Sequence, residues 1–137
     1  MKKIAYIILA TILLYAYMHK DLILASLYLK DNNPNNDTKA EELLINLSKQ
    51  NNVDANFLLG YYYKTPKYHN INYQKSFYYY NLASNLGDKK AKMIVAWYYY
   101  KGLGTPKNKE MAKKLLKELA VNGDNNALEI LKFVLVN

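Results

Sequence analysis

The sequence predicts an all-α protein, in which an array of antiparallel helix pairs follows a hydrophobic N-terminal segment. Three observations support this prediction. Residue types recur at intervals of 36 positions, which is typical of stacked supersecondary units. In each interval a residue suited to ending one helix stands directly before a residue suited to starting the next. No segment alternates apolar and polar residues with the period of two that a half-buried strand requires.

The N-terminal segment, residues 1–20, is typical of a targeting signal. Lys2 and Lys3 precede an uncharged run from residue 4 to residue 18 (IAYIILATILLYAYM), and His19 and Lys20 close it. This is the layout of a signal peptide, or of a signal anchor that remains attached. We expect this segment to direct the chain to or across a membrane.

Two properties of this segment favour retention over cleavage. Ala16 is the best small residue for a cut, but Leu14 stands where cleavage sites carry a small side chain. The apolar helix would span roughly 22 Å, and Lys3 and Lys20 extend it to about 27 Å by snorkelling, against a hydrocarbon core of about 30 Å. We expect a single membrane helix with residues 21–137 outside, in the periplasm if the cell is Gram-negative. A cleaved segment would leave a secreted or periplasmic protein, and the alternative is a buried core helix of a cytosolic protein.

Beyond residue 20 the chain repeats itself. Five sets of positions stand 36 residues apart: Asn36, Asn72 and Asn108; Ala40, Ser76 and Ala112; Asn51, Gly87 and Gly123; Asn52, Asp88 and Asp124; Ala55, Ala91 and Ala127. The third set suits the left-handed residue that ends a helix. The first and fourth sets suit N-caps, and Thr38 with Glu41 has the spacing of a capping box.

These signals define the expected helices. One set, the A helices, is expected near 20–30, 53–64, 89–101 and 124–136, and the other, the B helices, near 38–50, 73–86 and 108–121. Pro34, Pro66 and Pro106 are expected in the loops before the B helices, where a helix must break. The result is three helical hairpins and a final A helix that closes the array.

Composition excludes several classes of function. The 137 residues contain no cysteine, so disulfides, thiolate metal sites and a cysteine nucleophile are absent. All 19 basic residues are lysine, and the net charge is +8. Nucleic-acid recognition is disfavoured because it normally uses the guanidinium fork of arginine. We expect no cofactor, no metal and no small-molecule substrate.

The repeated residues resemble a known family. The pattern AxxxLGxxYxxGxG...AxxWxxxAAxxGxxxA is similar to the Sel-one-like repeat, a relative of the tetratricopeptide repeat. Residues 21–137 carry the resemblance. It is most complete at Ala91, Val95, Ala96, Tyr99, Gly102, Gly104, Ala112, Leu115, Leu119, Ala120, Gly123 and Ala127, and it continues at Ala55, Leu59, Gly60, Tyr63, Ser76, Tyr79, Ala83, Ser84 and Gly87. The resemblance implies a right-handed α-solenoid and a non-catalytic role as a scaffold that binds other proteins.

Three tyrosine triplets, at residues 61–63, 78–80 and 98–100, distinguish this sequence. Successive side chains on a helix point about 100° apart, so one buried face cannot hold all three. Around Trp97, one apolar face contains Tyr98 and Tyr99 and is expected to be core. The other contains Trp97 and Tyr100 and corresponds to the groove-lining face of tetratricopeptide arrays. We expect burial at Ala55, Leu59, Tyr63, Ala91, Val95, Tyr99, Leu115 and Leu119.

A peptide-binding groove is the leading functional prediction. Its expected lining residues are Phe57, Tyr61, Lys64, Met93, Trp97, Tyr100 and Phe133, of which Tyr61, Trp97 and Phe133 stand 36 residues apart. We expect an exported scaffold, anchored by its N-terminal helix, that holds an extended peptide or a partner helix along these aromatic side chains. Alternatively, the aromatic side chains only seal the contacts between repeats.

Two other functions remain open. Lysines around the third B helix would suit anionic lipid headgroups: Lys107, Lys109, Lys113, Lys114 and Lys117. Glu110 and Glu118 stand at salt-bridging spacing and favour a solvated surface instead. An enzyme acting on cell-wall material would need catalytic residues, but only His19 and His69 are present, and Glu41 and Glu42 point to different faces of their helix.

Overall fold

The computed structural model describes residues 2–31, 33–68 and 70–136. These residues form helices and no strand, as the sequence predicts. The helices are α1 (Lys2–Met18), α2 (Lys20–Tyr28), α3 (Pro34–Ser48), α4 (Val53–Lys64), α5 (Tyr73–Asn85), α6 (Lys89–Lys101), α7 (Lys109–Val121) and α8 (Asn125–Val136). The A helices are α2, α4, α6 and α8, and the B helices are α3, α5 and α7.

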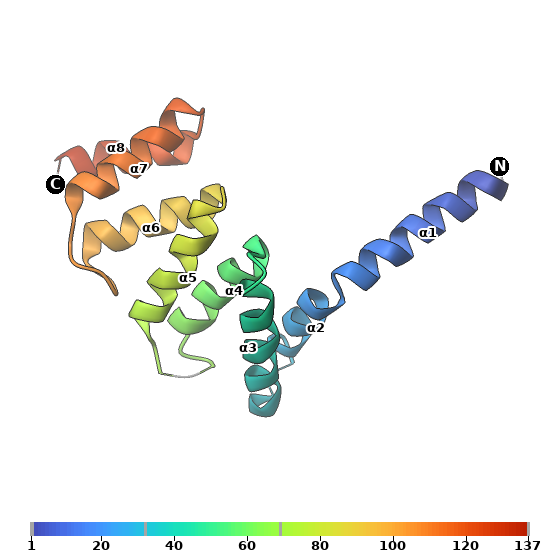
Figure 1. Ribbon diagram of the computed structural model, residues 1–137. Coiled ribbons are helices and arrows are strands. Elements are labelled where there is room, and N and C mark those ends of the chain that lie inside the picture. The colour runs from blue at the N-terminus through green and yellow to red at the C-terminus, as the bar shows by residue number, and fades with distance from the viewer. Residues whose placement is uncertain (1, 32, 69, 137) are drawn as a thin grey trace.

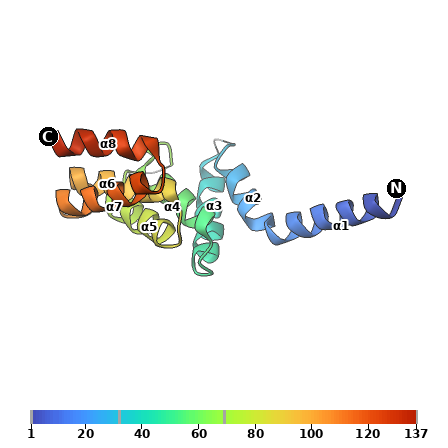
Figure 2. The same cartoon turned by 90° about the horizontal axis from the view of Figure 1, so that it is seen from above.

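The helices from α2 to α8 form an α-solenoid. Each A helix packs on the B helix that follows it, and each B helix packs on the next A helix. The chain therefore advances from α2 to α8 in sequence order, while α1 projects away from the array (Figures 1 and 2). The predicted three hairpins and the further A helix, α8, which packs on α7, are confirmed.

The predicted junctions between repeats are also confirmed. Asn51, Gly87 and Gly123 have positive φ angles of 58°, 99° and 86°. The side chains that follow them cap the next helix, because Asn52, Asp88 and Asp124 accept hydrogen bonds from backbone N–H groups at 2.9, 2.6 and 3.0 Å. Each repeat thus ends one helix and starts another through local contacts.

The start of the first B helix differs from the prediction. Helix α3 begins at Pro34, and the side chain of Asn33, not Asn36, caps it by accepting from the N–H of Asn35 at 3.1 Å. Proline fits the first helical position because its φ is preset and the N–H it lacks has no partner there. Pro34 therefore starts a helix instead of lying in a loop. Pro66 and Pro106 do lie in loops.

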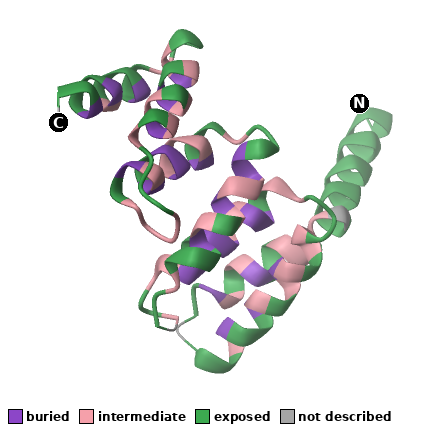
Figure 3. Ribbon diagram, turned by 60° about the vertical axis from the view of Figure 1, so that its left-hand side comes forward, coloured by how far each residue is buried: buried purple, intermediate pink, exposed green. Residues whose placement is uncertain are grey.

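The core lies between the A and B helices along the whole array (Figure 3). Six residues predicted to be buried are buried: Ala55, Leu59, Tyr63, Ala91, Val95 and Leu119. Leu115 and Tyr99 are only half-buried. In α7 the innermost side chains are Ala112, Leu116 and Leu119, which face α6 and α8, so Leu116 occupies the place predicted for Leu115.

Helix α1 lies outside this core. Its side chains from Lys2 to Tyr17 are all exposed, including large apolar ones such as Ile7 and Leu13. By length and composition no single described helix would cross a membrane. The stretches Lys2–Tyr17 and Lys20–Tyr28 meet at a bend of 60°. Taken together, these two stretches have the length and the apolar composition of a membrane span.

Candidate functional site

Three aromatic side chains project from successive A helices. Tyr61 on α4, Trp97 on α6 and Phe133 on α8 are 43%, 37% and 49% exposed. We call these three residues the aromatic row. An aromatic ring that is left this accessible is available for contact with another molecule, since its own chain covers little more than half of it.

Tyr100 was predicted to share this exposure, and that prediction is wrong. Its side chain is only 8% exposed and belongs to the core that contains Ala96 and Ala112. The ring of Tyr100 lies 5.5 Å from that of Trp97 and 6.1 Å from that of Phe133. Tyr100 thus lies beneath two members of the aromatic row and supports them, because these two rings cover it.

Phe57 and Met93 are half-buried. The ring of Phe57 makes an edge contact with Tyr80 at 5.3 Å, and Met93 packs against the core of the last repeat.

Phe57 also lines an apolar hollow of about 330 Å³ between α2 and α4. The aromatic pattern of the sequence did not indicate this hollow, because α2 contributes aliphatic side chains to it. Its lining residues are Leu22, Ile23, Ser26, Asp54, Phe57 and Leu58.

Lysine ammonium groups lie over the rings. The Nζ of Lys64 is 5.7 Å from the centre of the Tyr61 ring, and that of Lys101 is 4.8 Å from the Trp97 ring. Each such cation–π contact is worth about 0.5 to 1 kcal/mol at an exposed site. The two lysines are therefore held beside the aromatic row.

A polar cluster that the sequence analysis did not predict joins the first two repeats. The hydroxyl groups of Tyr62 and Tyr63 on α4 donate to the Glu41 carboxylate on α3, at 3.4 Å for Tyr62. The ammonium of Lys75 lies 4.7 Å from the centre of the Tyr63 ring. Burial, together with the nearby carboxylate of Glu41, raises the pKa of both tyrosines well above the ordinary value. These hydroxyls stay protonated at neutral pH, so they hold the helices together and supply no nucleophile.

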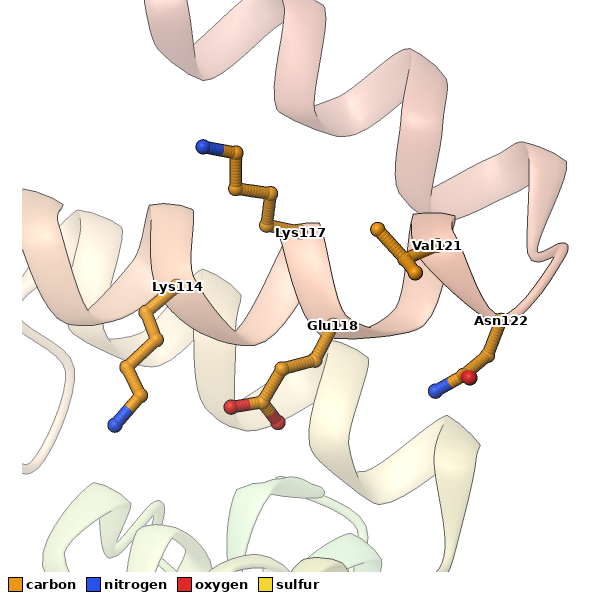
Figure 4. Close-up of a pocket in the computed structure, with 5 residues that line it drawn as sticks. All are labelled: Lys114, Lys117, Glu118, Val121 and Asn122. Carbon is orange, nitrogen blue, oxygen red and sulfur yellow. The ribbon is translucent and has the colours of Figure 1, made fainter.

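The lysine-rich surface of α7 carries acidic partners. Lys113 pairs with Glu110 at 3.1 Å, and Lys92 of α6 pairs with Glu118 at 3.1 Å. A shallow hollow of about 520 Å³ lies on this surface, and all of its lining residues come from α7 and its C-terminal end, namely Lys114, Lys117, Glu118, Val121 and Asn122 (Figure 4). Lys117 and Val121 lie on one side of the helix and Lys114 and Glu118 on the other. The surface of one helix does not enclose a ligand.

The described residues contain no group of three or more His, Asp or Glu side chains that would hold a metal ion. His69, one of the two histidines considered for catalysis, lies outside the described residues. Glu41, one of the two carboxylates considered, accepts hydrogen bonds from two tyrosines.

The fold defines the class of protein, which is that of the helical-repeat proteins. The family profile of the Sel1 repeat matches residues 53–88 and 90–124, and the chain belongs to the Sel1 repeat family. Sel1 repeat proteins are protein-interaction scaffolds, and their fold is generally non-catalytic. No curated protein matches the sequence.

Solved structures with the same fold support this assignment. A Sel1 repeat protein from Oxalobacter formigenes is 27% identical, with a TM-score of 0.70 over 82% of this chain and 85% of that one. Helicobacter pylori cysteine rich protein B is 22% identical, with a TM-score of 0.65 over 85% and 92% of the two chains, and shows similarity of fold alone.

A third structure is much longer than this chain. It is a protective antigen present in uropathogenic Escherichia coli strains that displays an SLR fold. It is 25% identical, with a TM-score of 0.65 over 69% of this chain. The matched region spans 20% of the length of the antigen.

Proposed function

We propose that this protein is a membrane-attached, exported scaffold that holds an extended peptide segment of a partner protein along the aromatic row. The observation that carries the proposal is the exposure of Tyr61, Trp97 and Phe133 at the same place in successive repeats. Clustered, partly exposed aromatic side chains are common anchors of protein interfaces, because each buries a large area on a side chain with few rotatable bonds.

Membrane attachment is the second part of the proposal. Helix α1 has 17 residues, and its apolar side chains from Ile4 to Tyr17 are exposed to solvent. An isolated helix with so much exposed apolar surface is unfavourable in water, and a lipid bilayer would cover it. Lys2 and Lys3 are its first two residues, so the positive-inside rule favours an orientation with the repeats on the outer side of the membrane.

A binding experiment tests the first part. Peptides are selected from a displayed random library on the full chain in a nonionic detergent, and their affinities are then measured for variants. Trp97→Ala should weaken binding by about 2 kcal/mol, or about 30-fold, with little change in the free energy of unfolding. Tyr78→Ala serves as the matched control, since Tyr78 is a 58% exposed aromatic residue of the B helix α5.

Two outcomes would contradict this proposal. Selected peptides that bind Trp97→Ala as tightly as the wild type would place the interaction elsewhere. If Trp97→Ala unfolds the protein as readily as Tyr98→Ala, the aromatic row is packing between repeats, because Tyr98 is 4% exposed and belongs to the core.

A further inference from the structure

We infer that the peptide held along the aromatic row is acidic, with carboxylate side chains between apolar ones. This inference rests on the proposed function and names the chemistry of its partner. Three features of the A helices point to it: the position of two lysines, the distribution of charge, and the apolar surface beside the row.

Lys64 and Lys101 flank the aromatic row without a carboxylate partner among the described residues. Each ammonium group lies over a ring, at 5.7 Å from Tyr61 and 4.8 Å from Trp97. An ammonium has three N–H donors, and a ring face satisfies at most part of this capacity. A carboxylate that approached from the solvent side would accept a hydrogen bond from a group that is already held in place.

The A helices that carry the row are short of acidic residues. Helix α6 contains four lysines and no aspartate or glutamate (KKAKMIVAWYYYK). Helix α4 contains only Asp54, in its first turn, and Glu129 of α8 pairs with Lys132 at 2.7 Å. Of the three helices, α6 thus carries the excess of positive charge, which attracts an acidic segment and repels a basic one.

Apolar surface adjoins the row at its N-terminal end. The hollow between α2 and α4, of about 330 Å³, adds an apolar contact on the N-terminal side of Tyr61. A peptide with Phe or Leu residues and with Glu or Asp between them would fit these contacts, because its apolar side chains would meet the rings and the hollow while its carboxylates would meet the lysines.

Three synthetic peptides test the inference. They have equal length and the same Phe and Leu positions, and they carry Glu, Gln or Lys at the positions between. Each is labelled with a dye and titrated with the full chain in a nonionic detergent. Fluorescence anisotropy gives the Kd. The emission of Trp97, the single tryptophan of the chain, reports contact at the row.

The Glu peptide should bind about tenfold more tightly than the Gln peptide, as two partly exposed ion pairs would provide, and the Lys peptide should bind most weakly. Added salt should narrow this difference. Lys64→Gln combined with Lys101→Gln should abolish the difference in Kd between the Glu and Gln peptides. The control variant, Lys49→Gln combined with Lys114→Gln, should preserve the difference in Kd between the Glu and Gln peptides. It removes the same charge from exposed positions at the end of α3 and on α7.

Other results overturn the inference. Equal Kd values for the Glu and Gln peptides would refute the acidic partner and leave the peptide-binding proposal in place. Failure of all three peptides to bind would contradict both. If vesicles that contain phosphatidylglycerol shift the Trp97 emission while no peptide does, the row contacts anionic lipid instead of a peptide.

Discussion

Three consecutive tyrosines of α6 have three different environments. Tyr98 is 4% exposed, and its hydroxyl lies 2.9 Å from the hydroxyl of Ser76 on α5. Tyr99 is half-buried and makes an edge contact with Phe77 at 5.2 Å. Tyr100 is buried beneath Trp97 and Phe133. The three side chains thus bind α6 to both neighbouring repeats, and the adjacent Trp97 is left as the exposed member of this helix.

Two adjacent leucines of α7 allow a matched test of the core. Leu116 is 1% exposed, whereas Leu115 is half-buried at the edge of a hollow shared with Tyr99. Leu116→Ala should lower the free energy of unfolding by about 2 to 5 kcal/mol, and Leu115→Ala by about 1 to 2 kcal/mol, because less apolar surface is lost there. Urea denaturation followed by circular dichroism measures both. A larger loss for Leu115→Ala would contradict the packing of α7 described above.

At the scale of whole helices, one position decides how closely an A helix approaches its B helix. It is Gly60 in α4, Ala96 in α6 and Lys132 in α8, each 36 residues after the one before. A Cβ atom at Gly60 would lie 2.7 Å from the Tyr80 ring, and the carbonyl of Gly60 accepts a hydrogen bond from Ser76 at 2.7 Å. In α8 the long side chain of Lys132 occupies this position and is exposed to solvent.

Gly60→Ala tests this close approach. Alanine normally favours a helix over glycine by about 1 kcal/mol. Here the added methyl group would collide with Tyr80, and we expect a net destabilisation of about 1 to 3 kcal/mol in thermal or chemical denaturation. The same substitution made in a Tyr80→Leu background should cost less, since the smaller and more flexible side chain moves aside. Stabilisation by Gly60→Ala in the wild type would refute the contact.

At the scale of the whole molecule, the chain consists of a packed array and one helix outside it. The core consists of three clusters of buried residues that follow one another from Ala25 on α2 to Val134 on α8. The described side chains of α1, from Lys2 to Tyr17, are all exposed and lie outside this core. The stability of the array therefore depends on burial between its helices. The position of α1 depends instead on the lipid or protein that covers its apolar side chains.

Sedimentation tests the proposed membrane attachment. Full-length protein expressed in a bacterial cell should sediment with membranes and resist alkaline extraction, because α1 buries its apolar side chains in lipid. A chain that begins at Lys20 should remain in the soluble fraction. An intact mass that lacks about the first sixteen residues would indicate a cleaved signal peptide instead of an anchor. Full-length protein with its intact mass in the soluble fraction would contradict attachment altogether.

The local sequence determined the helices, their boundaries and the order in which they pair. Capping is a contact between residues three positions apart, as between Asp88 and Ala91, so the repeated Asn, Asp and Gly residues were sufficient to predict it. The start of α3 was the exception, because Asn33 and Asn36 are both suitable caps and the fit of Pro34 to the first helical turn decided between them.

Tertiary structure alone decided which side chains remain exposed. Trp97 and Tyr100 lie on the same face of one helix, yet only Tyr100 is covered, because Phe133 reaches it from another repeat. Glu41 has the spacing of a capping box, but it accepts hydrogen bonds from tyrosines 21 and 22 residues away. Burial and long-range hydrogen bonding depend on neighbours that helical periodicity does not specify, which is why the repeat was predictable and the membership of its exposed aromatic row was not.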